Sequence, residues 1–251
     1  MGGHSHWSTI KRQKGAADAK RGQLFTKLSK EITISAREGG GDPNMNPRLR
    51  LAIDKARSEN MSADTIKRGI ERGVGGGDAA ALVETTFEGY GPGGVAIIVQ
   101  VVTDNRNRTV SELRTTLTRA GGSLGESGSV AWQFDNVGFI SLNPGDRDPD
   151  EVALAAIDAG AQDVRTEDGR IEVYTAPTEL ISVRKHLEEA GLAVETAELS
   201  MLPKNTLTLD EDSAGQVLRL LDTLEDLDDV QKVFSNADFP DAVLMEYAAS
   251  G

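Results

Sequence analysis

Apolar residues recur every three or four positions through the first 73 residues, which is the period of an amphipathic helix. Three such stripes predict three helices. The stripes are Leu24, Leu28 and Ile32, then Leu49, Ala52, Ile53 and Ala56, then Ile66 and Ile70. The first helix is expected to span Asp18 to Arg37. Asn46 and Ser62 are predicted to cap the second and third helices, and Gly73 to end the third.

From Leu82 the apolar residues form short runs that are typical of strands. The predicted elements are strands over 83–87 and 95–102, a helix from Asn107 or Thr109 to about 120, and a strand over 130–134. The first two strands should form a hairpin across the glycine-rich turn at 89–94. Thr109 and Glu112 fit a capping box at the start of the helix.

Residues 137–202 carry six elements in the order strand, helix, strand, strand, helix, strand. The strands are expected over 139–142, 163–165, 171–174 and 193–199, and the helices over 149–159 and 178–190. This βαββαβ order is that of a ferredoxin-like domain. Gly169 supplies a hairpin turn between the two middle strands.

Three more elements follow Pro203, with strands over 206–209 and 230–234 and a helix over 214–224. They are too few to bury a core alone, so we expect them to complete the sheet that begins at Leu82. The prediction is an α+β fold of three domains, with no element in the tail. The domains are a helical domain of 1–77 with an N-terminal arm, a central α/β domain of 78–136 and 203–240, and an inserted ferredoxin-like domain of 137–202; the tail is 241–251.

Charge divides the chain into two regions of opposite sign. Residues 1–73 hold 15 Lys and Arg against 8 Asp and Glu, whereas residues 74–251 hold 12 against 32. A segment that stays basic inside a chain of net charge −13 indicates a local docking surface for a polyanion. The acidic remainder would repel phosphate, so such a contact should be confined to the N-terminal region.

Composition and motifs argue against catalysis, metal binding and a membrane. The chain has no cysteine, and its three histidines lie in the arm and on an acidic helix. The glycine pattern at 89–94 resembles a dinucleotide fingerprint, but a strand rather than a helix follows it. The longest apolar run is too short to span a bilayer, and a secretory signal is lacking. We expect a cytoplasmic protein without enzymatic activity, cofactor, metal or small-molecule substrate.

Two other segments could contact nucleic acid. The segment 104–109 carries Arg106 and Arg108 between a strand end and a helix N-terminus, where they could hold a phosphate, or else pair with surface carboxylates while Asn107 or Thr109 caps the helix. The ferredoxin-like unit has Phe139 and Tyr174 where an RNA-binding module stacks bases. Its 5 basic against 14 acidic residues favour a protein-contact or spacing role instead.

The basic helical domain is the strongest candidate for a binding site. The residues predicted to hold a nucleic-acid backbone are Lys11, Lys14, Lys20, Arg21, Lys27, Arg48, Arg50, Lys67, Arg68 and Arg72, with Arg106 and Arg108 as secondary candidates. The alternative is an ordinary solvated helix surface. Contacts of this kind position a protein and carry little sequence information, so DNA and RNA both remain open as targets.

Several long motifs also resemble one protein family. They are GHSHW (3–7), KRGQLFTKL (20–28), REGGGDP (37–43), NPRLR (46–50), NMSADTI (60–66), EGYGPGGVA (88–96), TDNRNRT (103–109) and GSVAW (128–132). By these motifs the chain resembles the YebC/PmpR family as far as about Leu244. The resemblance implies a helical N-terminal domain, a second domain interrupted by a ferredoxin-like third, and no enzymatic activity. His6, Ser62 and Gly69 stand where the family usually has Lys, Pro and Ala.

The resemblance also implies the class of function. Members of the family are described as cytoplasmic DNA-binding transcriptional regulators, and others, including a mitochondrial translational activator of cytochrome oxidase, act on ribosomes. A DNA-binding transcriptional regulator is therefore the first expectation. The alternative is a translation factor that docks on ribosomal RNA, with its acidic domains reaching protein partners. A further alternative is a protein adaptor whose basic surface is incidental.

Overall fold

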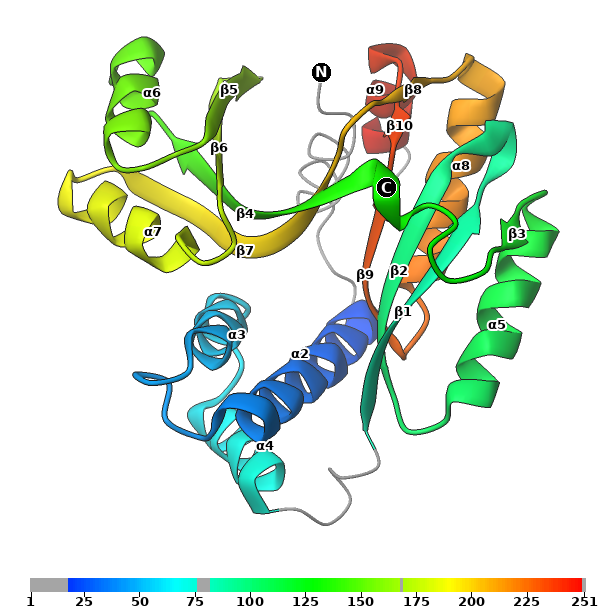
Figure 1. Ribbon diagram of the computed structural model, residues 1–251, viewed down its shortest axis with the longest axis horizontal. Helices are drawn as coiled ribbons and strands as arrows, with labels where there is room; N and C mark the ends of the chain where they lie inside the picture. The colour runs from blue at the N-terminus through cyan, green and yellow to red at the C-terminus, as the bar shows by residue number, and fades with distance from the viewer. Residues whose placement is uncertain (1–17, 76–81, 168, 250–251) are drawn as a thin grey trace. The chain divides into compact units, whose positions relative to one another are not determined.

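The computed structural model describes residues 18–75, 82–167 and 169–249 (Figure 1). The chain divides into two compact units. The first unit joins the residues up to Gln133 with those from Pro203 onward, and the second is Phe134–Leu202. The first unit contains the N-terminal helices and a central sheet, and the second contains a sheet of its own, so the fold is α+β as the sequence predicts.

Three helices form the N-terminal part, as predicted. They are α2 (Asp18–Gly39), α3 (Pro47–Ser58) and α4 (Ala63–Gly75). The Asn46 side chain accepts a hydrogen bond from the Leu49 N–H at 3.1 Å and caps α3, with Pro47 in the first turn. The Ser62 hydroxyl accepts the Thr65 N–H at 3.3 Å and caps α4. Both predicted caps are thus confirmed, and the predicted apolar stripes form the core between the helices.

The crossing of α2 and α4 brings Gly73 against the α2 backbone. Gly73 was predicted to end the third helix, which is wrong, because α4 continues to Gly75. Gly73 instead lies against α2, where an added Cβ would overlap the Thr33 carbonyl oxygen and approach the Ala36 Cβ to 2.8 Å. One turn earlier, the Gly69 carbonyl accepts a hydrogen bond from the Thr33 hydroxyl at 3.2 Å. Glycine at position 73 lets the two backbones touch.

A four-stranded sheet of order β3-β1-β2-β9 forms the centre of the first unit. Its strands are β1 (Val83–Tyr90), β2 (Ala96–Thr103), β3 (Ser123–Leu124) and β9 (Val230–Ser235). The strands β1 and β2 form the predicted antiparallel hairpin, whose turn contains the short helix η2 (Pro92–Gly94). The strand β9 pairs with β2, so one of the two strands predicted after Pro203 joins this sheet.

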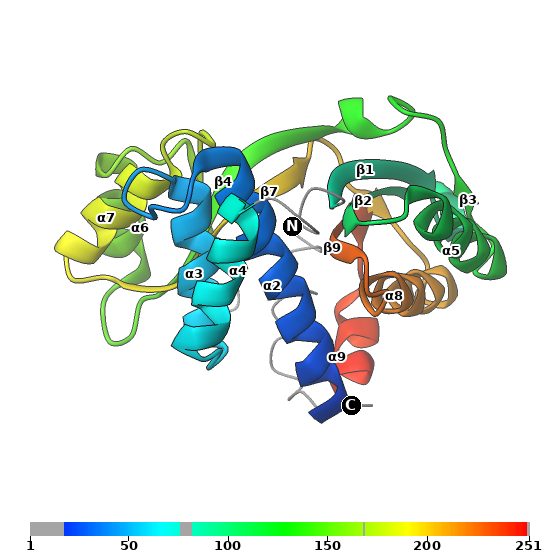
Figure 2. The same ribbon diagram turned by 90° about the horizontal axis from the view of Figure 1, so that it is seen from below.

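Two helices cover one face of the central sheet. They are α5 (Arg106–Arg119) and α8 (Glu211–Glu225), which lie side by side (Figure 2). Alternate residues of β2, including Ile97 and Val99, pack against Leu113 of α5 and Leu221 of α8 in one apolar cluster. The inward-facing residues of the strand, which recur every two positions, and those of the helices, which recur every 3.6, therefore form one shared core.

Three details of the central region differ from the sequence predictions. The start of α5 is capped by Asn105, whose side chain accepts the Arg108 N–H at 3.1 Å, and not by Asn107 or Thr109. The predicted strand over 130–134 is instead the 3₁₀ turn η3 (Ala131–Gln133). The strand expected at 206–209 shortens to β8 (Leu207–Thr208), which pairs in parallel with β10 (Ala237–Asp238) outside the main sheet.

The tail was predicted to have no element, which is wrong. The helix α9 spans Asp241–Ala249, and its Val243 and Leu244 are buried in the central core. The segment is rich in good helix formers, but it is short and apolar on several sides, so it shows no helical period.

The second unit has the predicted βαββαβ order. Its elements are β4 (Phe134–Asn143), α6 (Pro149–Asp158), β5 (Asp163–Glu167), β6 (Arg170–Thr175), α7 (Leu180–Glu189) and β7 (Ala193–Pro203). The strand order β5-β6-β4-β7 is that of a ferredoxin-like sheet. Phe139 and Tyr174 face each other across β4 and β6, with ring centroids 5.7 Å apart, and Arg165 lies over the Tyr174 ring at 4.9 Å. Both rings are buried, unlike base-stacking residues.

Candidate nucleic-acid interface

The helix α4 presents three cations on the side opposite its buried face. Ile66, Gly69 and Gly73 are buried, while Lys67, Arg68 and Arg72 are exposed. We call Lys67, Arg68 and Arg72 the cationic face. Because these three residues lie within about 140° of arc on a helix of 3.6 residues per turn, one ligand could meet all of them.

The side chains of the cationic face are weakly engaged by the rest of the chain. The Lys67 ammonium lies 3.7 Å from the Glu71 carboxylate, and both side chains are more than half exposed. The Arg68 guanidinium bonds the Asp64 carbonyl and the Thr65 hydroxyl of its own helix, each at 3.3 Å. Arg72 makes no hydrogen bond or ion pair with the residues that the structure describes. Exposed pairs of this kind contribute little, so an incoming phosphate would meet weak competition.

Arg48, another predicted contact, is held by carboxylates within the chain. Its guanidinium lies 2.9 Å from Glu31, 2.8 Å from Glu38 and 2.8 Å from Glu84, the last through two nitrogens. Burial lowers the pKa of Arg48, but the hydrogen bonds and charges of Glu84 and Glu31 outweigh it and raise the pKa overall. Since Glu84 belongs to β1, Arg48 ties the helices to the central sheet.

The other predicted cations of the helical domain have more varied surroundings. Arg50 donates to the Pro43 and Asn44 carbonyls at 3.0 and 3.2 Å and braces the loop before α3. Lys27 donates to the Glu225 carbonyl at the end of α8. Arg21 is exposed and lies 6.0 Å from the Phe25 ring.

Three predicted contacts lie partly or wholly outside the described residues. Lys11 and Lys14 lie outside the described residues, and Lys20 lies in the first turn of α2 with a side chain that is not described. Their binding role stays a prediction.

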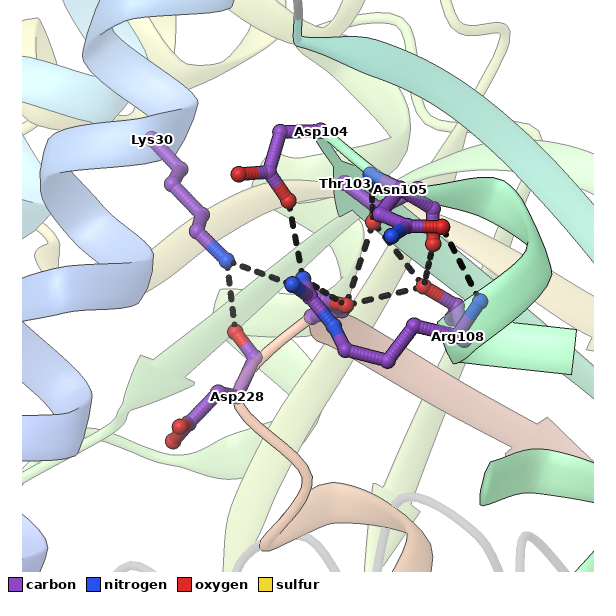
Figure 3. A network of polar contacts seen from close by, with 8 residues as sticks. Lys30, Thr103, Asp104, Asn105, Arg108 and Asp228 are labelled. Carbon is purple, nitrogen blue, oxygen red and sulfur yellow. Dashed lines mark hydrogen bonds and ion pairs between the residues drawn. The ribbon is translucent and has the colours of Figure 1, made fainter. Parts of the chain in front are cut away.

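Arg108, in segment 104–109, lies beside a buried carboxylate. Asp229 is 3% exposed and accepts hydrogen bonds from Lys30 at 2.9 Å, Arg108 at 2.8 Å, Thr109 at 2.8 Å and Thr103 at 3.1 Å (Figure 3). Arg108 also pairs with Asp104 at 2.8 Å. The segment is therefore a junction of β2, α5 and α2, and the Arg108 charge is balanced within the chain.

The pKa values at this junction follow from its contacts. Burial raises the pKa of Asp229, but the hydrogen bonds from Arg108, Lys30 and Thr109 outweigh it and lower the pKa to about 2. The hydrogen bond between Arg108 and Asp229 also raises the pKa of Arg108. Arg106, the other candidate here, is exposed and lies over the Phe87 ring at 5.6 Å. The geometry around Arg108 matches the ion-pair interpretation, with Asn105 as the cap.

Several cations that join the helices to the sheet were not recognised as such from the sequence. From the sequence, Lys27 was assigned to the nucleic-acid contacts, and Lys30 and Arg37 were given no role. In the structure, Lys27 and Lys30 reach the end of α8 and the start of β9, and the Arg37 guanidinium donates to the Leu82 carbonyl. The one signal in the sequence was that Lys27, Lys30 and Arg37 lie on one side of the first helix. Such a row of cations is equally typical of a side that faces solvent and of a side that contacts a neighbouring domain. Arg57, an exposed cation near the end of α3, was also left out of the predicted set.

A second buried carboxylate organises the loop after β3. Glu88 accepts backbone hydrogen bonds from Gly128 at 2.6 Å and from Val130 and Ala131 at 2.7 Å. Burial raises the pKa of Glu88, but these three bonds together lower it below its usual value. They also bend the chain into η3, which explains why no strand forms at 130–134.

Among the described residues, no group of three His, Asp or Glu side chains could hold a metal ion. The two buried carboxylates with lowered pKa values are used by structural hydrogen bonds. Within the same residues, none of the helices combines the length and apolar character needed to cross a bilayer.

Comparison with known proteins identifies similar sequences along nearly the whole chain. The family profile described as "TACO1/YebC protein N-terminal domain" matches residues 5–76, and that described as "TACO1/YebC second and third domain" matches residues 82–237. A "Probable transcriptional regulatory protein" of Herpetosiphon aurantiacus is 55% identical over the full length of both chains. A protein of Dehalococcoides mccartyi with the same description is 53% identical over 98% of each chain.

A solved structure is similar as well. The crystal structure of a conserved hypothetical protein from Aquifex aeolicus superposes with a TM-score of 0.83 at 43% identity. The match covers 89% of this chain and 92% of that one. At this identity the two chains share the fold over most of their length.

Proposed function

The chain belongs to the TACO1/YebC family, and from this premise we propose that it is a non-enzymatic regulator of gene expression that binds nucleic acid through its helical domain. The observation that carries the proposal is the cationic face of α4. Three exposed cations lie opposite a buried stripe, on a helix whose backbone is packed against α2. Because the helix backbone is already ordered, binding carries no additional cost for ordering the backbone that presents these side chains.

The charge of the remaining chain supports a confined contact. Residues 74–251 carry a net charge of −20, which repels a phosphate backbone from most of the surface. The binding free energy should therefore come from a small number of Lys and Arg contacts. Such binding weakens steeply as salt increases, because the release of counterions then contributes less.

DNA is the first target in this proposal. Relatives more than 50% identical are described as probable transcriptional regulatory proteins. Arginine side chains such as those of Arg68 and Arg72 can also donate two hydrogen bonds to the major-groove edge of a guanine. We expect this regulator to act in the cytoplasm, without cofactor or small-molecule substrate in the binding step.

Ribosomal RNA is the second candidate, and one observation favours it. Neither α3 nor α4 contains an Asn or Gln, so the exposed faces of these helices lack the side chains that read adenine. Their cations would hold phosphates of any sequence, which suits docking on a structured RNA. In that case the acidic domains would contact protein partners.

A matched pair of lysines tests whether the cationic face binds nucleic acid. Lys67 on α4 is 75% exposed and lies 3.7 Å from Glu71, while Lys185 on α7 is 72% exposed and lies 3.6 Å from Glu189. We expect K67E to weaken binding to duplex DNA and structured RNA, and K185E to leave it unchanged. The salt slope of the logarithm of the binding constant should fall by about one for each phosphate that a variant no longer neutralises.

The double variant R68E/R72E should show a larger effect than K67E. Binding and salt dependence that remain equal to wild type in R68E/R72E would contradict the proposal and favour the protein-adaptor alternative. Sedimentation of a lysate through a sucrose gradient then separates the two targets. Co-migration with ribosomes and sequence-blind DNA binding would indicate the RNA target, whereas DNA binding that survives competitor would indicate a transcriptional regulator.

A further inference from the structure

An open groove of about 420 Å³ lies between the helices α5 and α8. Leucines of both helices, such as Leu117 and Leu221, belong to the apolar core that packs α5 and α8 against the central sheet. The groove itself is mainly polar. Its lining includes Thr116 and Arg119 from α5, and Gln216, Arg219, Leu220 and Thr223 from α8. These positions recur every three or four residues, so they form one continuous face on each helix.

The charge of the groove is opposite to that of its surroundings. Two arginines and no carboxylate line it, although residues 74–251 hold 12 basic residues against 32 acidic ones. Arg119 and Arg219 are both exposed, and neither guanidinium forms an ion pair with the described part of the chain. The helix α8 carries four carboxylates of its own, yet none of them lines the groove.

Intrahelical pairing does not account for these arginines. Asp222, three residues after Arg219, accepts a hydrogen bond from the Tyr247 hydroxyl of α9. The Arg219 guanidinium lies instead toward Gly215, where an added Cβ would be 3.5 Å from its Nη1. On α5, the positions three and four residues before Arg119 are Thr116 and Thr115, which carry no charge. Each guanidinium therefore keeps hydrogen-bond donors for a ligand.

The donor and acceptor groups suit a phosphate that is attached to a hydroxylated body. Arginine presents a planar fork that matches phosphate oxygens. The Thr223 hydroxyl donates to the Arg219 carbonyl at 2.7 Å, so its lone pairs can accept from a ligand hydroxyl. The Gln216 amide can both donate and accept. The volume lies in the range of small-molecule sites.

We propose that the groove between α5 and α8 binds a phosphorylated small molecule of nucleotide size, with Arg119 and Arg219 holding its phosphate. The site shares no residue with the cationic face of α4 and does not depend on nucleic-acid binding there. Leu220, which is 2% exposed, lies at the floor of the groove and gives it an apolar surface. A sugar or a nucleobase could rest against this surface.

Isothermal titration of the full chain tests this proposal with four probes. These are adenosine 5′-monophosphate, inorganic phosphate, adenosine and a short single-stranded oligonucleotide. We expect adenosine monophosphate to bind more tightly than phosphate, and adenosine not to bind. The double variant R119Q/R219Q should weaken adenosine monophosphate binding at least about tenfold, because it removes two charge-assisted hydrogen-bonding groups. The double variant R119K/R219K keeps both positive charges but lacks the planar guanidinium groups. Its affinity for adenosine monophosphate should therefore lie between that of wild type and that of R119Q/R219Q.

Arg114 provides the matched control. It is an exposed arginine on α5 that does not line the groove, so R114Q should bind all probes like wild type. Thermal unfolding must show that each variant remains folded. Equal affinity of wild type and R119Q/R219Q for adenosine monophosphate would overturn the proposal, as would no binding of any phosphate probe. A double variant that fails to bind only the oligonucleotide would also overturn it, by assigning the groove to a nucleic-acid backbone.

Discussion

Lys30 and Asp229 are 199 positions apart in the chain, yet the Lys30 ammonium lies 2.9 Å from the Asp229 carboxylate. This ion pair joins α2 to the start of β9, and the contact between Arg48 and Glu84 joins α3 to β1. The helical domain is thus attached to the central sheet by at least two ion pairs whose partners are distant in sequence. Several cations that resemble a binding surface in the sequence are used in this attachment.

Replacement of Asp229 should destabilise the first unit. D229N removes the carboxylate charge that Lys30 and Arg108 share, which should lower the free energy of unfolding by about 2–3 kcal/mol. Urea denaturation monitored by circular dichroism measures the change. D228N is the matched control, because Asp228 is exposed and contributes only its carbonyl oxygen to Lys30. An equal loss of stability in both variants would contradict a special role for Asp229.

The same carboxylate predicts a dependence of stability on pH. Its pKa is about 2 in the folded protein, below the value near 3.9 of an unfolded aspartate. The unfolded state therefore binds a proton first as pH falls, and the stabilisation is complete above pH of about 4 and disappears toward pH of about 2. Chemical denaturation between these values should show a steeper loss of stability in wild type than in D229N. Parallel curves would indicate that Asp229 titrates normally.

Removal of the Glu88 carboxylate should open the loop that contains Trp132. E88Q replaces one acceptor oxygen by an amide that faces backbone donors, and we expect a local cost of roughly 2 kcal/mol. Hydrogen exchange at Gly128, Val130 and Ala131 should accelerate, because their N–H groups bond this side chain. E126Q, at an exposed position of the same loop, serves as the control. Unchanged exchange in E88Q would show that other contacts hold the loop.

The two glycines near the end of α4 should respond differently to alanine. In G73A the new methyl group overlaps the Thr33 carbonyl, so α2 and α4 must separate, and we expect the free energy of unfolding to fall by about 1–3 kcal/mol. At Gly75 an added Cβ meets no atom within 4 Å, so G75A should be neutral or slightly stabilising. Thermal unfolding of both variants checks the contrast. A stable G73A would mean that the two helices can shift apart without cost.

Much of the architecture could be predicted because it depends on local periodicity. The stripes of Leu24 to Ile32 and of Leu49 to Ala56 predicted two helices, and the ferredoxin-like order followed from alternating short runs. The caps Asn46 and Ser62 were also visible, because a cap acts within three residues. The errors lie where a distant residue determines local structure. Glu88 bends residues 128–131 into a turn, and the central core orders the tail through Val243 and Leu244.

By itself the sequence determined the family, the fold class and the concentration of positive charge near the N-terminus, since motifs, periodicity and composition are properties of the chain. Only the tertiary structure decided which cations remain available to a ligand. Arg48 and Arg108 meet carboxylates, whereas Lys67, Arg68 and Arg72 face solvent. It also placed Arg119 and Arg219 in the lining of one groove. The reason is physical: a charge acts through its distance to other charges, and folding sets that distance between residues far apart in the chain.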